Sequence, residues 1–437
     1  MAEQGTEPAP APAAGLPQHP GDGFTADPLG VLEEGHRRYG PVFRMPLDGV
    51  ETVLVGTWAG LGELFAAERG RLEVLNTPLV HDLFGRALFN LTAEGHAEAR
   101  RRLRPALSGR ALSGYVPSLL GVIGPVTGRW AMAGTMDLHG QVRELTGAMS
   151  ARVLLGIAPG EEDAPDFAAA FDRFVTATGA PPGPARFTDR RYWAGRSTRQ
   201  DLHDLFARRA AQAAGDVTGG SALPGLVAAF ADAPAAAGAL ADHLLALLIA
   251  ARETTASLLT WCLVELAGNR EHARLASAEA RGVSADPSLL VARGALPVLR
   301  SVLAESLRLH SPNLLSMRET VCPVTLGGHR IEAGTRVAYS PSAGHFDPET
   351  FPRPRAFRPG RFLGGQASGS RLWAFGGGAH ACLGRPLAEL MALAVMARAL
   401  QRGLPRLPGG PPARISFRPA KAPIDPLPFA LDQEPVS

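Results

Sequence analysis

Hydrophobic and polar residues follow two different periods along this chain. Apolar residues recur every three to four positions through Pro28–Tyr39 and through most of the chain from residue 58 to about residue 282, which predicts helices. The short runs 42–45 and 52–55, joined through Asp48 and Gly49, predict two strands. Further helices are expected around 96–107, 141–156, 162–177, 190–214 and 239–266, and a second strand-rich patch at 324–339.

Segments rich in glycine, proline or alanine separate these elements, and none of these segments indicates a domain boundary. Gly and Pro cluster at 179–184, and Gly and Ala fill 215–239, where 227–240 is an alternative weak helix. The Gly/Ser segment 364–370 is expected to be flexible. Residues 1–24, rich in Ala, Pro and Gly, predict a disordered tail, so that one domain would occupy 25–437. The predicted fold class is mainly α with small β-sheets.

Composition narrows the classes of function. A net charge of +3 over 437 residues, without a long basic run, gives no reason to expect a nucleic-acid partner. The start of the chain shows neither a basic region nor an apolar stretch of signal or anchor length, so no membrane association is expected. Three widely spaced cysteines indicate a reducing compartment rather than a disulfide framework, and the expected location is cytoplasmic.

One cysteine, Cys382, stands in a glycine-rich run from Phe375 to Gly384, directly before an apolar helix. Glycines let backbone N–H groups turn toward the sulfur, and the helix N-terminus favours negative charge there. A thiolate that binds a metal without other cysteines nearby suits an axial haem ligand better than zinc or an iron–sulfur cluster. The alternatives are an inert buried thiol and a dinucleotide loop, although no βαβ unit or suitably spaced acidic residue supports the loop.

This run resembles the haem-binding loop of the cytochrome P-450 family, Phe-Gly-x-Gly-x-His/Arg-x-Cys-x-Gly, at every position. The resemblance implies that Cys382 is the axial ligand of a haem b iron and that Phe375, Gly376 and Gly384 form the loop around it. The match continues into residues 387–389, at the start of the helix that packs on the haem in that family. The family's single-domain, triangular, α-rich fold is implied as well.

Glu305 and Arg308 lie three residues apart in the expected helix Pro297–Leu309 and can form a charge-assisted pair. Taken alone, such a pair is more often a solvated surface pair. The proline-rich segment 346–362 resembles the family's meander, in which an arginine joins the Glu-x-x-Arg pair. The resemblance implies that Arg361 takes that position and that the three side chains form a buried structural network.

Four basic side chains are expected, by resemblance, to reach the haem propionates. His96 and Arg100 match the family's His-x-x-x-Arg pair, Arg318 matches the arginine beside the substrate channel, and His380 matches a donor within the cysteine loop. The alternative for each is an exposed basic residue, and the arginines at 100–104 are equally compatible with a solvated face.

The longest apolar helix expected, 244–259, places Ala250, Ala251 and Thr254 on one face and Arg252 nearly opposite. The segment resembles the family's Ala/Gly-Gly-x-Asp/Glu-Thr-Thr motif, with Ala251 in place of the usual glycine. The resemblance implies that Thr254 is the oxygen-activating threonine and that Glu253 is the acid of a proton relay. A core helix whose Thr254 bonds back to a carbonyl one turn earlier is the alternative.

Together these motifs imply a haem-thiolate monooxygenase that inserts one oxygen atom from O2 into a hydrophobic small molecule, in secondary-metabolite biosynthesis. The resemblance implies a separate ferredoxin and an NAD(P)H-dependent ferredoxin reductase, and a monomer is expected. Basic residues at 101, 102 and 104 are candidates to meet an acidic ferredoxin, or are solvated surface. Alternative functions are decarboxylation, desaturation or coupling by the same fold, and a non-catalytic homologue that activates a partner enzyme.

Overall fold

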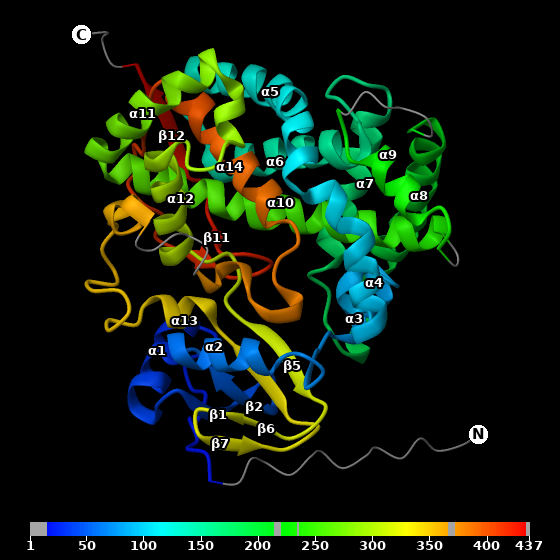
Figure 1. The fold of residues 1–437 in the computed structure, drawn as a ribbon, viewed down its shortest axis with the longest axis vertical. Helices are drawn as coiled ribbons and strands as arrows, with labels where there is room; N and C mark the ends of the chain where they lie inside the picture. The colour runs from blue at the N-terminus through cyan, green and yellow to red at the C-terminus, as the bar shows by residue number, and fades with distance from the viewer. Residues whose placement is uncertain (1–14, 214–219, 234–235, 366–371, 434–437) are drawn as a thin grey trace. The chain divides into compact units, whose positions relative to one another are not determined.

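The computed structural model describes residues 15–213, 220–233, 236–365 and 372–433, which form two compact units (Figure 1). The sheet unit comprises the described residues up to Leu75, Leu314–Arg355 and Trp373–Ala381. The helical unit comprises Asn76–Asn313, Ala356–Leu372 and the described residues from Cys382 onward. Each unit is therefore assembled from segments that lie far apart in the sequence.

The sheet unit is built on five strands in the order β1-β2-β8-β5-β3. The first two strands pair antiparallel, with Val42 opposite Val55, and Asp48 and Gly49 both have positive φ in the tight turn between them, as such hairpins require. The strands predicted at 42–45 and 52–55 are thus confirmed, as is the patch at 324–339. The elements of this unit are α1 (Pro28–Tyr39), β1 (Val42–Leu47), β2 (Val50–Val55), α2 (Trp58–Ala67), β3 (Leu72–Val74), β5 (Ser316–Thr320), β6 (Val324–Leu326), β7 (His329–Ile331), β8 (Arg336–Tyr339), α13 (Pro341–His345), η7 (Trp373–Phe375) and η8 (Gly378–His380).

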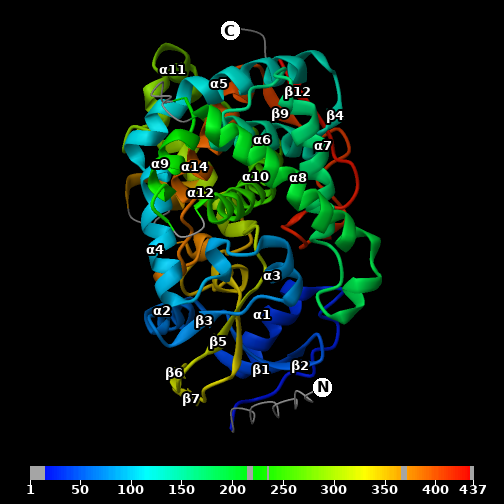
Figure 2. The ribbon, with the colours of Figure 1, turned by 90° about the vertical axis from the view of Figure 1, so that its right-hand side faces the viewer.

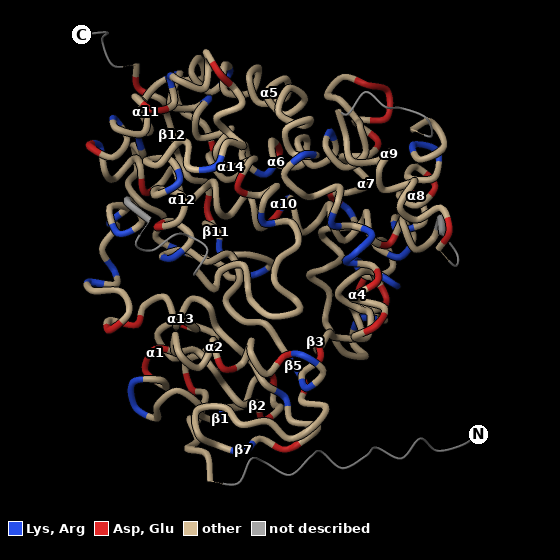
Figure 3. The backbone as a smooth tube through the Cα atoms, viewed as in Figure 1, with Lys and Arg blue, Asp and Glu red and all other residues tan. Residues whose placement is uncertain are grey.

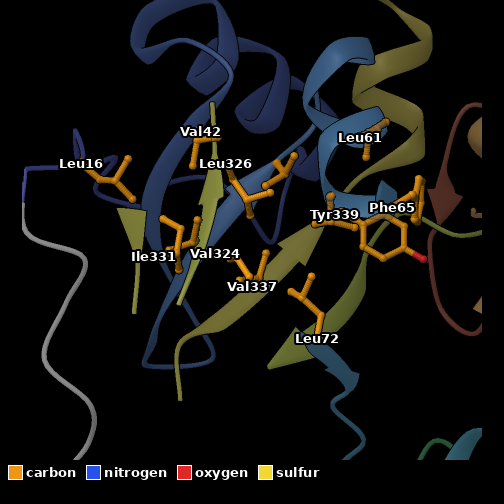
Figure 4. Close-up of a cluster of buried hydrophobic side chains, with 13 residues drawn as sticks. Leu16, Val42, Leu61, Phe65, Leu72, Val324, Leu326, Ile331, Val337 and Tyr339 are labelled. Atoms are coloured by element: carbon orange, nitrogen blue, oxygen red, sulfur yellow. The ribbon is translucent and has the colours of Figure 1, made fainter. Parts of the chain in front are cut away.

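A cluster of buried apolar side chains from α2 and the strands forms the core of the sheet unit (Figure 4). Leu16 belongs to this cluster with 3% of its surface exposed, and the backbone N–H of Arg44 donates to the Pro17 carbonyl. The tail predicted over residues 1–24 is therefore too long at its C-terminal end. Its first fourteen residues lie outside the described part of the chain.

The helical unit surrounds one long helix, α10 (Ala236–Gly268), which packs against α6, α8, α12 and α14 (Figures 1 and 2). Most of its described side chains between Leu240 and Leu266 are buried, because neighbouring helices cover it on several sides. The other elements are α3 (Pro78–Phe84), η1 (Leu88–Asn90), α4 (Ala93–Leu103), η2 (Arg104–Leu107), α5 (Gly109–Met132), β4 (Met136–Asp137), α6 (Leu138–Leu155), α7 (Asp163–Ala177), η3 (Pro184–Thr188), α8 (Arg190–Ala213), α9 (Leu223–Phe230), α11 (Arg270–Ala285), η4 (Pro287–Leu290), α12 (Pro297–Leu309), η5 (Pro359–Gly365), α14 (Arg385–Leu400), β9 (Leu404–Arg406), β10 (Ile415–Ser416), β11 (Ala422–Pro423) and β12 (Pro428–Asp432).

The fold class predicted from the sequence, mainly α with small sheets, is confirmed. The 24-residue helix α5 was not predicted, because Pro117 and Pro125 lie inside it and proline usually breaks a helix; packing against α6 and α14 compensates. Within the described residues, α5 and Gly238–Gly268 of α10 are long and apolar enough to cross a membrane, yet 72% of the α10 window is buried inside the fold, as in a core helix. The flexible segment predicted at 364–370 lies mostly outside the described residues.

Candidate active site

The glycine-rich loop before Cys382 lies in the sheet unit and is packed against the end of α2. Phe375 ends η7, and Gly376 and Gly378 adopt positive φ angles of 65° and 61°, a region that glycine tolerates. A Cβ atom on Gly377 would lie 2.7 Å from the Phe65 ring. The loop therefore needs glycine both for its conformation and for its close approach to α2.

Cys382 is the first residue of the chain after this loop that belongs to the helical unit, and its side chain is exposed. Although the residue is exposed, the protein atoms packed around the sulfur reduce its hydration, which raises the pKa of the thiol. Backbone N–H groups of Gly384 and Arg385, at the start of α14, and the charges of Arg100 and Arg385 act in the opposite direction by stabilising the thiolate. The other two cysteines are also free.

One face of α10 is accessible although most of the helix is buried. Ala250 and Thr254 are exposed and Leu247 and Ala251 are half-buried, and these four positions share one helical face. Ile249 is half-buried as well but lies off this face. The hydroxyl of Thr254 donates to the Ala250 carbonyl at 2.6 Å. The predicted face of small residues with one hydroxyl is therefore present. The alternative, a core helix, required Thr254 to donate to the carbonyl one turn earlier. That bond is present as well, but Thr254 is exposed and not buried in a core. We call these four residues the α10 stripe.

Glu253, expected to be the acid beside Thr254, lies away from the α10 stripe and is buried. Its carboxylate accepts hydrogen bonds from Arg143 of α6 at 3.1 and 3.3 Å, and the Nε atom of Arg252 lies 3.7 Å away. Arg252 is itself buried, pairs with Asp172 of α7 at 2.6 Å and lies over the ring of Phe171. Arg252 thus points away from the stripe, as predicted, and Glu253 is one member of a charged network.

Glu305 and Arg308 of α12 are fully buried, which rules out the surface-pair alternative. The guanidinium of Arg308 donates two hydrogen bonds to the carboxylate at 2.8 and 2.9 Å, and a third to the Ala356 carbonyl at 3.3 Å. Arg361 donates to the same carboxylate at 3.0 Å, and so does the backbone N–H of Arg358 at 2.9 Å. The predicted three-membered network is present, and its three members belong to the helical unit.

The four residues expected to meet the propionates divide between the two units. His96 is buried and Arg100 half-buried on α4 of the helical unit, and the charge of Arg100 reaches the Cys382 sulfur. Arg318 on β5 and His380 belong to the sheet unit, where Arg318 is buried. There the carboxylate of Glu68 accepts hydrogen bonds from the Arg318 Nε at 2.8 Å and from the His380 backbone N–H at 3.3 Å.

Sequence reasoning missed Glu68, Arg143 and Asp172. Glu68 and Arg318 are 250 positions apart, and Arg143 and Glu253 are 110 apart, so no spacing could have indicated these pairs. Each is a charged residue that sequence patterns alone place on a solvated helix face.

The donor groups fit a haem. The Cys382 sulfur, with two backbone N–H donors and two nearby positive charges, suits an anionic axial ligand. In the same unit, the α10 stripe offers small side chains and a hydroxyl, which leave room for a small ligand and can hydrogen-bond to it. Arg100, on α4 of this unit, supplies a cation that suits a propionate.

Comparison with known proteins agrees with this geometry. The family model described as Cytochrome P450 matches residues 236–420, from the start of α10 to beyond the cysteine loop. Cyclooctat-9-en-7-ol 5-monooxygenase of Streptomyces melanosporofaciens is 28% identical over 346 residues, covering 72% of this chain and 74% of the relative. Sterol 14alpha-demethylase of Mycobacterium bovis is 26% identical over 388 residues, covering 85% and 86%.

The fold is similar to that of the solved structure of retinoic acid-bound cyanobacterial CYP120A1. The TM-score is 0.83 with 23% identity, and the match covers 95% of this chain and 98% of the other. At that identity the likeness concerns the fold alone. The family-model match and the curated relatives, together with the cysteine loop, support a bacterial cytochrome P450 monooxygenase that binds haem b.

Proposed function

We propose that this protein is a cytoplasmic enzyme of secondary metabolism that transfers one oxygen atom from O2 to a hydrophobic small molecule. The observation that carries the proposal is the α10 stripe, an accessible face on a buried helix, in the same unit as the sulfur of Cys382. The stripe is apolar apart from the hydroxyl of Thr254, which suits an apolar substrate. A relative named for the 5-monooxygenation of cyclooctat-9-en-7-ol, an unsaturated alcohol, supports this substrate class.

In the proposed mechanism, each residue of the site has one task. Cys382 would hold the iron through its thiolate, and His96, Arg100, Arg318 and His380 would bind the propionates. The bound haem supplies reductive activation of dioxygen and oxygen transfer to the substrate. Thr254 would hold and pass a proton at Oγ1, adjacent to the Ala250 carbonyl to which it now donates.

Glu253 would supply protons to Thr254 only when its pair with Arg143 opens. Both of its oxygens accept hydrogen bonds from that guanidinium, and the carboxylate is largely buried. Because the side chain of Arg143 is 35% exposed, it can swing toward solvent and release the carboxylate. The pair then acts as a gate between bulk water and the site.

Electrons would come from NAD(P)H through a reductase and a ferredoxin. Arginines on α4 are candidates to meet an acidic partner, yet Arg101 and Arg102 both pair with Glu98, and Arg102 pairs also with Asp232. Figure 3 shows the mixed charges along α4. These acidic partners neutralise part of the positive charge of the α4 arginines. The helix should therefore attract an acidic ferredoxin less strongly than its number of arginines suggests.

The carbon-monoxide difference spectrum of the reduced protein tests the proposal directly. The wild type and a Cys322→Ser variant, which changes another free cysteine, are expected to show the long-wavelength Soret band of a thiolate ligand. The Cys382→Ser variant should lose this band together with activity. A haem-loaded wild type without the band, or a Cys382→Ser variant that keeps it, would contradict the proposed role of Cys382.

A further inference from the structure

Glu68, the residue that directly follows α2, is a buried carboxylate to which neither the fold nor the mechanism above assigns a task. Only 1% of its surface is exposed, and Phe65, three residues earlier on α2, belongs to the apolar core of the unit. A buried carboxylate is costly unless it is paired and hydrogen-bonded. Glu68 meets both conditions through partners that come from two distant segments of the chain.

The first partner is Arg318. Its Nε donates to Glu68, one Nη donates to the Met317 carbonyl at 2.9 Å, and the other reaches the Tyr339 hydroxyl at 3.4 Å. The guanidinium also lies over the ring of Tyr339, 5.1 Å from its centroid. Within the described residues these bonds engage three of the five N–H groups of an arginine, so the side chain is held in place with donors to spare.

The second partner is the cysteine loop. The other oxygen of Glu68 accepts the backbone N–H of His380 at 3.3 Å, two residues before the cysteine. The carboxylate also occupies the space that a Cβ on Gly378 would fill. One carboxylate therefore touches both the arginine expected at a propionate and the loop that leads to the axial ligand.

We propose that Glu68 is a positioning residue of the haem site, which fixes Arg318 and the cysteine loop relative to each other. The inference rests on the proposed haem-thiolate function. Each oxygen of the carboxylate has its own task, so a group with only one acceptor oxygen cannot replace it. Glu68 also balances the charge of Arg318, so that the protein needs no further anion to keep this guanidinium buried before haem binds.

The Glu68→Gln variant tests this proposal because glutamine keeps the shape but has one acceptor oxygen and no charge. We expect haem transfer to apomyoglobin to become about tenfold faster or more, the effect of losing a charge-assisted hydrogen bond. The reduction potential of the retained haem should shift to a more positive value, because a nearby negative charge is lost. The control is Glu63→Gln on the same helix, whose exposed carboxylate accepts the Gly327 N–H instead, and it should change neither quantity.

A cycle with Arg318→Met separates positioning from simple packing. If Glu68 acts through Arg318, the double variant should release haem no faster than Arg318→Met alone. Should Glu68→Gln fail to fold because Arg318 is left as a lone buried charge, the double variant carries neither charge and the comparison with Arg318→Met still holds.

The results divide cleanly. An unchanged potential and haem release in Glu68→Gln, or a tenfold acceleration that persists when Arg318 is already methionine, would overturn the proposal. A wild-type protein that binds no haem would instead contradict the function on which it rests.

Discussion

Two regions of the helical unit hold polar groups in opposite ways. Around Glu305, two arginines and a backbone N–H converge on one carboxylate, and both members of the central pair are fully buried. On the α10 stripe, Thr254 is exposed and its hydroxyl makes one local bond, to the Ala250 carbonyl. The first region is closed by the protein itself, whereas the second leaves a hydroxyl available to something else.

We propose that this difference separates residues that support the site from residues that act in it. A saturated ion network exchanges nothing with a ligand, and its loss exposes buried charges to an apolar interior. A hydroxyl on an accessible face contributes little to folding, but it is free to change partners during a reaction. The loss of unfolding free energy should therefore decrease from substitutions at Glu305 through Glu253 to Thr254. The loss of coupling between electron consumption and product formation should increase in the same order.

The largest effect on stability is expected for Glu305→Gln. The amide leaves Arg308 as a buried charge without its counter-ion, which costs about 3–5 kcal/mol of the free energy of unfolding. Urea unfolding and the haem content of the purified protein measure it. As a control, Glu98→Gln removes a half-exposed partner of Arg101 and Arg102 and should cost less than about 1 kcal/mol. Equal stability and normal haem content in both variants would show that the buried network does not support the fold.

An intermediate effect is expected for Glu253→Gln, because Arg143 is partly exposed and can be solvated after the change. We expect a loss of about 1–3 kcal/mol in unfolding free energy, together with slower product formation. The matched variant Arg143→Gln should lose similar stability but keep product formation, since it frees the carboxylate. If both variants slow product formation equally, the ion pair rather than the acid is what the reaction needs.

The sequence predicted those parts of the structure whose signals are local. The turn at Asp48 and Gly49, the face shared by Ala250 and Thr254, and the glycine-rich approach to Cys382 each depend on residues within a few positions of one another. These features can be predicted from the sequence because the periods of helices and strands and the conformations of glycine depend on residues close by in the chain.

The parts that could not be predicted depend on contacts between distant segments. Glu68 meets Arg318 across 250 positions, and Leu16 joins a core whose other members extend to Tyr339. The helix α5 was missed for a related reason, because packing outweighs the local effect of its two prolines. The buried charged network around Glu305 was predicted only through the family resemblance, and the pairs of Glu68 with Arg318 and of Arg143 with Glu253 had no signal in the sequence.

The smallest effect on stability, and the largest on the reaction, is expected for Thr254→Val. The change removes one exposed hydroxyl bond within a helix, so the unfolding free energy should change by less than about 1 kcal/mol. Without the hydroxyl, proton delivery fails, and electrons from NAD(P)H should leave as hydrogen peroxide rather than as product. Oxygen uptake, peroxide and product, measured together, give the coupling.

Thr255 provides the matched control, since it carries the same side chain one position further along α10. Its hydroxyl is buried and has no hydrogen-bond partner among the described residues, so Thr255→Val should leave stability equal or slightly higher. Coupling should stay at the wild-type value, because this side chain does not belong to the α10 stripe. Equal peroxide release from the two valine variants would mean that the reaction responds to packing along α10 and not to the accessible hydroxyl.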